Sequence, residues 1–210
     1  MTIKRKKFLT FLYVTAIIKN VNNHKTTAHR KDGEKVRIKK MKMSDYVVKY
    51  GYKTTDTGAT GKSFERACKE HLHMLSKVAR AGHSDMRRAN VYHEIKTGGG
   101  ELGNDGEKLV KGSSRVIYCP RVESDKELDE QTAFVLSRTD FLLVLESCGL
   151  LREKISTNGQ RKITIQTFWN NKLNAPHGKK YFKLLDALNA CVACGHAMQF
   201  SEWLKNGWAL

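Results

Sequence analysis

Alternating polar and apolar positions over residues 84–96 predict two short strands joined by a tight turn, the second ending in three consecutive glycines. Because successive side chains of a strand point to opposite faces, Val91 and Ile95 are predicted to face a core. Glu94 and Lys96 share the opposite face. The pattern therefore places a carboxylate and an ammonium group side by side on one strand.

Apolar periodicity predicts the remaining elements around this pair of strands. A helix is expected from Ser63, its predicted cap, to about Arg80, and five glycines within residues 98–106 predict a loop. The other expected elements are strands at 115–119 and 133–136, a helix at 141–147 capped by Thr139 or Asp140, a hairpin at 152–166 around Asn158-Gly159, and a C-terminal helix over 181–192. This alternation predicts an α/β fold with a small central mixed sheet flanked by helices.

The positive charge is concentrated at one end of the chain. The 210 residues carry a formal net charge of +17, and residues 1–42 hold 13 Lys or Arg against two acidic residues. We predict a basic N-terminal arm at 1–42 and a single α/β domain at 43–210. An excess of positive charge favours a polyanionic partner, either nucleic acid or an anionic membrane surface, and a solubilising tail is the alternative for the arm.

An apolar run from Phe8 to Ile18 follows the basic residues 4–7. Eleven residues are too few to span a bilayer as a helix, so the run is predicted to be a packed helix or strand. A surface-lying amphipathic segment and a secretory signal are the alternatives. Five scattered cysteines, an odd number, indicate reduced thiols and a cytoplasmic protein without a disulfide framework; membrane attachment is not expected.

Two carboxylates and a lysine are expected to converge on the predicted strand pair. Asp85 precedes the first strand and can reach the face that Glu94 and Lys96 share. Paired carboxylates form a hard oxygen site suited to Mg²⁺, and a lysine beside that metal can orient a water and offset charge on phosphate. The same spacing also fits a solvated hairpin whose charges face water.

Asp85 followed by Glu94-x-Lys96 resembles the active-site motif of the PD-(D/E)XK nuclease superfamily, with Ser84 in place of the proline that can precede the aspartate. The resemblance covers roughly residues 63–119, about a quarter of the chain. It implies a restriction-endonuclease-like fold and a Mg²⁺ (or Mn²⁺) ion held by Asp85, Glu94 and the carbonyl of Ile95. It also implies that Glu65, at the rim of the preceding helix, completes the carboxylate set, and that Lys96 positions the attacking water.

The resemblance predicts a metal-dependent nuclease that hydrolyses phosphodiester bonds in DNA, with no small-molecule cofactor. The small size of the chain and its basic arm favour an endonuclease of phage or mobile-element type, and double-strand cleavage with one active site per chain favours a homodimer. Basic residues expected to contact the backbone are Arg87, Arg88, Lys154, Arg161 and Lys162. Two alternatives remain open at this point: a non-catalytic, winged-helix-like DNA-binding protein and a basic RNA-associated protein. DNA or RNA as substrate, and endonuclease or exonuclease action, also stay open.

Overall fold

The computed structural model describes residues 40–53, 58–71, 85–88, 91–104, 115–155, 157, 159 and 161–206, with only the backbone of 86–88, 103–104 and 206. All of them belong to residues 35–210, the second of two units into which the chain divides. The predicted basic arm, apart from its last three residues, and the apolar run Phe8–Ile18 lie outside the described residues.

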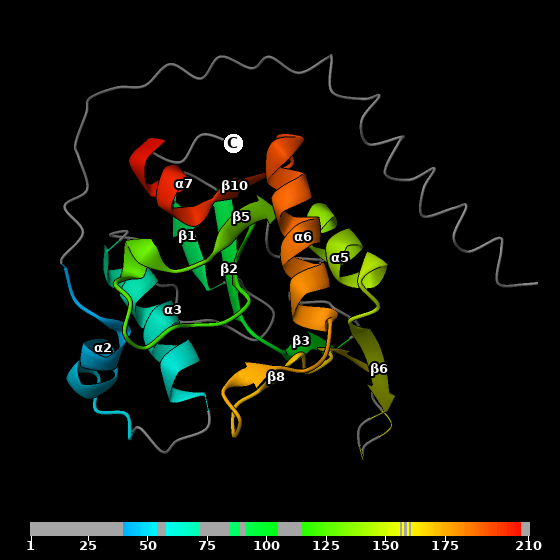
Figure 1. Ribbon diagram of the computed structural model, residues 1–210, viewed down its shortest axis with the longest axis horizontal. Helices are drawn as coiled ribbons and strands as arrows, with labels where there is room; N and C mark the ends of the chain where they lie inside the picture. The colour runs from blue at the N-terminus through cyan, green and yellow to red at the C-terminus, as the bar shows by residue number, and fades with distance from the viewer. Residues whose placement is uncertain are drawn as a thin grey trace, which may run out of the picture. The chain divides into compact units, whose positions relative to one another are not determined.

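A five-stranded mixed sheet forms the centre of this unit (Figure 1). Its strands run in the order β1 (Met86–Arg88), β2 (Val91–Thr97), β4 (Arg115–Cys119), β5 (Phe134–Ser137) and β10 (Ala197–Gln199). The β2–β4 pair is parallel and the other pairs are antiparallel. The strands at the centre are rich in β-branched and aromatic residues, which pack well on a pleated surface.

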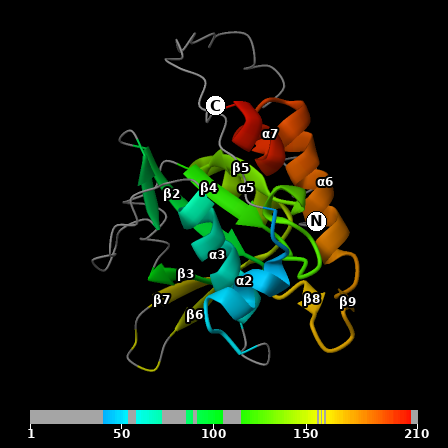
Figure 2. The same cartoon turned by 90° about the vertical axis from the view of Figure 1, so that its left-hand side faces the viewer.

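One face of this sheet is covered by α2 (Met43–Lys49), α3 (Ala59–His71), the 3₁₀ helix η1 (Leu128–Glu130) and α7 (Phe200–Asn206). Figure 2 shows α2 and α3 on this side. Ile95, Ile117 and Val135 of neighbouring strands point into this layer, where they pack with Phe64 of α3 and Trp203 of α7. Alternation along β2 therefore places Ile95 in the core, as the sequence predicts.

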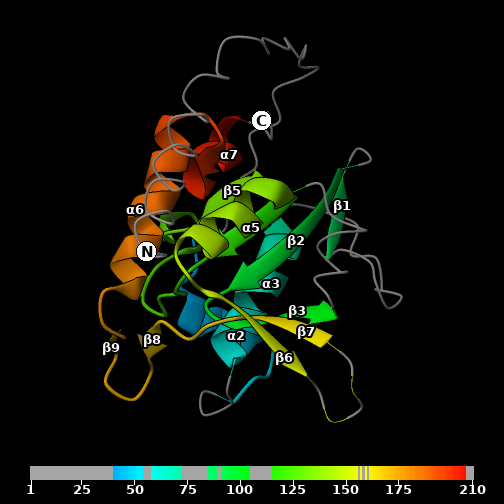
Figure 3. The ribbon, with the colours of Figure 1, turned by 90° about the vertical axis from the view of Figure 1, so that its right-hand side faces the viewer.

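The opposite face packs on α5 (Arg138–Ser147) and α6 (Lys180–Ala193), which Figure 3 shows on the side away from α2 and α3. A second sheet, ordered β3 (Gly100–Asn104), β7 (Arg161–Ile165) and β6 (Leu151–Ile155), adds Leu102 and Ile165 to the same core. The short hairpin of β8 (Trp169–Asn170) and β9 (Ala175–Pro176) follows. The prediction of a mixed sheet flanked by helices is confirmed.

The helix before the motif strands begins earlier than its sequence predicts. It starts at Ala59, so Ser63 is a buried residue inside α3 and not its cap. The first turn packs against the end of β2, because a Cβ added at Gly61 would lie 2.5 Å from Thr97 Oγ1. This tertiary contact favours continuing the helix back to Ala59, through residues that read locally as a loop. The predicted end of the helix, 72–80, lies outside the described residues.

Two further local predictions are wrong. The cap of α5 is Ser137, whose Oγ accepts a hydrogen bond from the Asp140 backbone N–H at 3.0 Å; Thr139 and Asp140 lie within the helix. The glycine-rich stretch after Lys96 is not entirely a loop, since Gly100–Asn104 forms β3 and pairs with β7. Glycine has a low strand propensity, so this stretch gives no local strand signal; its backbone hydrogen bonds come from a partner strand about sixty residues away.

Among the residues described, no helix combines the length and the apolar character that crossing a bilayer requires.

Candidate active site

Asp85 and Glu94 are brought together by the register of the first two strands. Met86 pairs with His93, so the next antiparallel pair beyond the end of the ladder is Asp85 with Glu94. The Oδ2 atom of Asp85 accepts a hydrogen bond from the Ile95 backbone N–H at 2.9 Å. Because the N–H and C=O of an extended residue lie on the same side of its strand, the Ile95 carbonyl also faces this edge.

Glu94 is buried, whereas the alternative of a solvated hairpin would leave its side chain exposed to water. Its side chain is 3% exposed, and its Oε1 forms an ion pair with Lys96 Nζ at 2.8 Å. Its second oxygen, Oε2, has no hydrogen-bond partner among the described residues. A buried carboxylate oxygen without a partner is energetically costly, so this atom is suited to receive a cation or an ordered water.

Glu65 approaches the pair from α3. Its carboxylate forms an ion pair with Lys69 one helical turn further on, and its side chain is 35% exposed. The charge of Glu65 is one of those that raise the pKa of Asp85, which places the two carboxylates within electrostatic range. The Lys69 ammonium lowers the pKa of Asp85 and so opposes this effect. Its i,i+4 spacing from Glu65 on the predicted helix is a sequence signal for that ion pair. We refer to Asp85, Glu94, Glu65, Lys96 and Lys69 as the acidic cluster.

The electrostatics of this cluster are most marked at Asp85. Burial, and then the negative charges of Glu94 and Glu65, raise the pKa of Asp85 from 3.8 to about 6. The Ile95 N–H and the Lys69 ammonium act in the opposite direction. These surroundings disfavour the ionised form of Asp85, so a divalent cation bound nearby would stabilise that form.

A Mg²⁺ ion beside Asp85 and Glu94 would need backbone carbonyl and water oxygens as ligands in addition to the two carboxylates. Within the described ranges, no set of three or more His, Cys, Asp or Glu side chains is arranged to hold a metal ion. Asp85 and Glu94 are the two carboxylates of the pair, and Glu94 Oε2 lacks a partner. Mg²⁺ commonly takes one or two carboxylates and keeps several waters, so this small set is compatible with it.

The basic residues predicted to contact a backbone are not all on one surface. In the β6–β7 ladder Lys154 pairs with Lys162 and shares its face, whereas Arg161 pairs with Ile155 on the other face. Arg161 forms a bidentate interaction with Glu153, with Nε 2.9 Å from Oε2, and Lys162 forms an ion pair with Glu101 at 3.2 Å. The side chains of Arg87 and Arg88 lie outside the described residues.

Comparisons of the chain with protein-family models, with curated proteins and with solved structures found no match. The function is therefore argued from the acidic cluster itself, which combines two adjacent carboxylates, a buried oxygen without a partner and a paired lysine.

Proposed function

We propose that the chain is a metal-dependent nuclease that hydrolyses phosphodiester bonds in DNA, with the acidic cluster as its active site. The observation that carries the proposal is the position of Asp85 opposite Glu94, with the buried Oε2 of Glu94 unpartnered. A pair of carboxylates in which one buried oxygen has no donor is a suitable environment for Mg²⁺ or Mn²⁺. The restriction-endonuclease-like arrangement, with α3 before the motif strands of a mixed sheet, is part of the same proposal.

In this proposal Asp85, Glu94 and the carbonyl of Ile95 hold the metal, and Glu65 contributes directly or through a water. A metal held there would polarise the scissile phosphate and make a nearby water more acidic. Lys96 is already oriented by its ion pair with Glu94. Its ammonium group donates a hydrogen bond to the attacking water and offsets the negative charge that grows on the phosphate in the transition state.

The proposed compartment is the cytoplasm. All five cysteines are free thiols, and Cys68, Cys119 and Cys148 are buried. Burial raises the pKa of the Cys148 thiol and so keeps it in the unreactive protonated form. Free thiols of this kind suit a reducing environment.

A plasmid-cleavage assay tests the proposal. Supercoiled DNA is incubated with the protein in Mg²⁺, in Mn²⁺ and in EDTA, and with the variants Glu94→Gln and Lys96→Ala. We expect nicked or linear DNA with either metal, none in EDTA, and at least a hundredfold slower cleavage by either variant, since positioned groups of this type contribute about 10²–10⁴-fold. The controls are Glu153→Gln, at an exposed carboxylate, and Lys126→Ala, at a half-buried lysine that forms an ion pair with Glu123 away from the acidic cluster.

A second candidate, a DNA-binding protein without catalysis, is supported by one feature. Helix α5 is followed by the β6–β7 hairpin, as in the last part of a winged helix, and the hairpin carries Lys154 and Lys162 on one face. The elements immediately before α5 are strands β4 and β5, where a winged helix requires helices. A protein that retards DNA in a gel equally in Mg²⁺ and EDTA, and never cuts it, would support this candidate and exclude the nuclease.

A further inference from the structure

A basic cavity lies beyond the end of β2, away from the acidic cluster. Its volume is about 650 Å³. The lining begins at Gly99, three residues after Lys96, and comes from two structures: the β3–β7–β6 sheet and the β8–β9 hairpin. The lining includes three cations, an aromatic ring and two neutral polar side chains: Arg152, Lys154, Lys172, Trp169, Thr164 and Asn170.

The polar face of the small sheet forms one side of this cavity. Arg152 pairs with Thr164 across the β6–β7 ladder, and Thr164 pairs with Glu101 across β3–β7, so these three side chains share a face. Lys154 lies in the next row of the same face. The opposite face of the sheet carries Leu151 and Ile165 into the core. One face of the sheet therefore reaches the core through Leu151 and Ile165, and the other face presents cations to the cavity.

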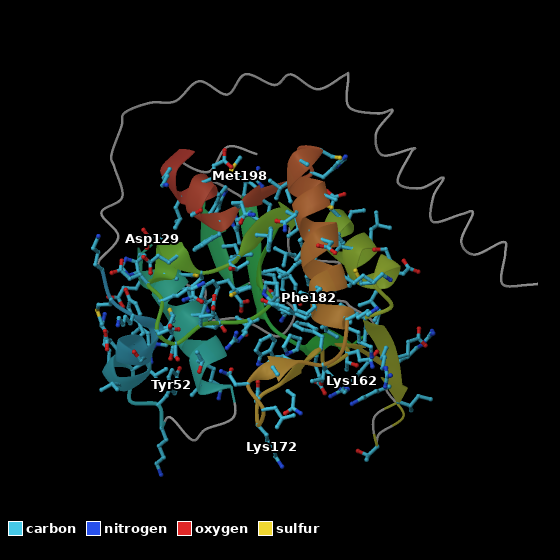
Figure 4. All side chains as sticks on the ribbon, in the orientation of Figure 1. Tyr52, Asp129, Lys162, Lys172, Phe182 and Met198 are labelled. Carbon is cyan, nitrogen blue, oxygen red and sulfur yellow. The ribbon has the colours of Figure 1, made fainter. Side chains whose placement is uncertain are left out.

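Three of these cations have no anionic partner in the part of the chain that the structure describes. Arg152, Lys154 and Lys172 line the cavity and form no ion pair there, while the lining carboxylate of Glu101 is neutralised by Lys162. Figure 4 labels Lys172 on the β8–β9 turn and Lys162 on the neighbouring sheet. Three uncompensated positive charges around one concave space favour a ligand with several negative charges.

The other side of the cavity holds an aromatic ring in a fixed position. The Arg121 guanidinium lies 3.9 Å from the centroid of the Trp169 ring, and Tyr181 contacts it edge-on at 5.0 Å between centroids. Arg121 also donates a hydrogen bond to Asn174 Oδ1 at 2.7 Å, which ties it to the turn. Trp169 is thus immobilised where it borders the cavity, beside the amide side chain of Asn170.

Apolar side chains stand exposed near the ends of both bounding hairpins. Ile155, at the end of β6, is 79% exposed, and Leu173, in the β8–β9 turn, is 73% exposed. Isolated exposed aliphatic residues need no explanation, but here one lies on each of the two hairpins that form the cavity. Neither side chain lines the cavity, and Ile155 lies on the face of β6 opposite Lys154, so the binding proposal does not depend on them.

We propose that this cavity binds a single-stranded segment of nucleic acid, with Arg152, Lys154 and Lys172 on successive phosphates and Trp169 against a base. A positively charged groove combined with an aromatic platform is how proteins hold single strands. A cavity of this size holds a ligand of drug-like dimensions, hence one or two nucleotides and not a double helix. The inference deepens the proposed nuclease and rests on it for the identity of the ligand, since it assigns the cavity to unpaired nucleotides of the nucleic acid that the acidic cluster would cut.

Binding is measured in EDTA, so that neither a metal nor cleavage is needed. A fluorescein-labelled twelve-residue oligothymidylate is titrated with the full chain at several salt concentrations. The triple variant Arg152→Gln, Lys154→Gln, Lys172→Gln is compared with a control of equal charge, Lys40→Gln, Lys42→Gln, Lys205→Gln, whose three exposed lysines do not line the cavity. The control accounts for the contribution of overall charge, including the basic N-terminal residues.

For the triple variant we expect Kd to rise by about tenfold or more beyond the control, and the slope of log K against log salt to fall in magnitude by about 2, at about 0.7 per phosphate contact to a single strand. The variant and its control must show the same circular dichroism and melting temperature. Equal slopes for the two triple variants would overturn the proposal.

Base contacts are tested separately with Trp169→Phe and with an abasic oligonucleotide of the same length. Binding should quench tryptophan fluorescence in the wild type, and Trp169→Phe should lose that quench although Trp203 and Trp208 remain. The abasic strand and the matching duplex should each bind at least about fivefold more weakly than oligothymidylate. Equal binding of the duplex or the abasic strand, or equally effective competition by polyglutamate, would overturn the assignment to unpaired nucleotides.

The two proposals fail in different assays. A chain that binds single strands through the cavity and never cuts plasmid would refute the nuclease and leave the site in place. A chain that cuts plasmid but whose triple variant binds like its control would refute the cavity and leave the nuclease in place.

Discussion

Replacing Asp85 with asparagine is expected to stabilise the metal-free protein. The pKa of Asp85 is raised to about 6 in the folded state, against 3.8 ordinarily. A carboxylate with a raised folded-state pKa contributes stability that is present below the unfolded pKa and lost as pH rises through the folded pKa. Above pH 6 the ionised Asp85 therefore opposes folding, and Asp85→Asn removes that cost. Its amide oxygen can still accept the hydrogen bond from Ile95 N–H.

The size of the effect follows from the two pKa values. At about 1.36 kcal/mol per pH unit of displacement, the full difference amounts to about 3 kcal/mol at pH 8. At pH 5, where Asp85 is already largely protonated in the folded state, it falls to roughly half of that value. The unfolding free energy of Asp85→Asn, relative to wild type, should therefore increase by roughly 1 kcal/mol between pH 5 and pH 8.

Urea denaturation at pH 5, 6, 7 and 8, in EDTA, measures this difference. The exposed Asp125→Asn is the control and should show no comparable trend with pH. Repeating the series in Mg²⁺ tests the metal assignment, because a ligand at a hundred times its Kd stabilises the folded state by about 2.7 kcal/mol. Wild type should gain stability and Asp85→Asn should not. A variant destabilised equally at every pH, or stabilised by Mg²⁺ as much as wild type, would refute the reasoning.

Three further predictions concern the framework and the site. Ser137→Ala removes the cap that accepts from Asp140 N–H and should lower the unfolding free energy by about 1 kcal/mol in urea denaturation; a change below 0.3 kcal/mol would contradict that role. Gly61→Ala places a Cβ against Thr97 Oγ1 and should cost about 1–3 kcal/mol, and a double-mutant cycle with Thr97→Ala should recover most of it, whereas additive effects would locate the strain elsewhere. Cleavage of plasmid by wild type should fall as pH drops below about 6, because protonation of Asp85 weakens metal binding; a rate that stays level to pH 5 in sub-saturating Mg²⁺ would argue against Asp85 as a ligand.

The local pattern of polar, apolar and turn residues is enough to predict several structural elements of this chain. The alternation of Glu94, Ile95 and Lys96 determines that Ile95 enters the core and that the other two side chains share the opposite face. Val91, which is also predicted to face a core, is half-buried at the start of β2 and lies outside the core clusters. The hairpin of β6 and β7 follows from its turn residues and flanking strands, as expected. These features depend on neighbours within a few residues, so the sequence carries them without knowledge of the rest of the fold.

Other features come from partners far away in the chain. The start of α3 at Ala59 depends on the close packing of Gly61 on Thr97, and the strand character of Gly100–Asn104 depends on its pairing with β7. Charge counting predicted a basic hairpin, yet only ladder register separates Arg161, paired with Glu153, from Lys154 beside the cavity. Register and long-range packing are properties of the assembled sheet and have no local signature.

The sequence by itself determined the residue types of the acidic cluster and their spacing along two strands. Only the tertiary structure decided that Glu94 is buried with an unpartnered oxygen, that Asp85 binds the Ile95 N–H, and that the charge of Glu65 reaches Asp85 from α3. The physical reason is that spacing sets which side chains can meet, whereas burial and the fields of non-neighbouring charges set what those groups do once they have met.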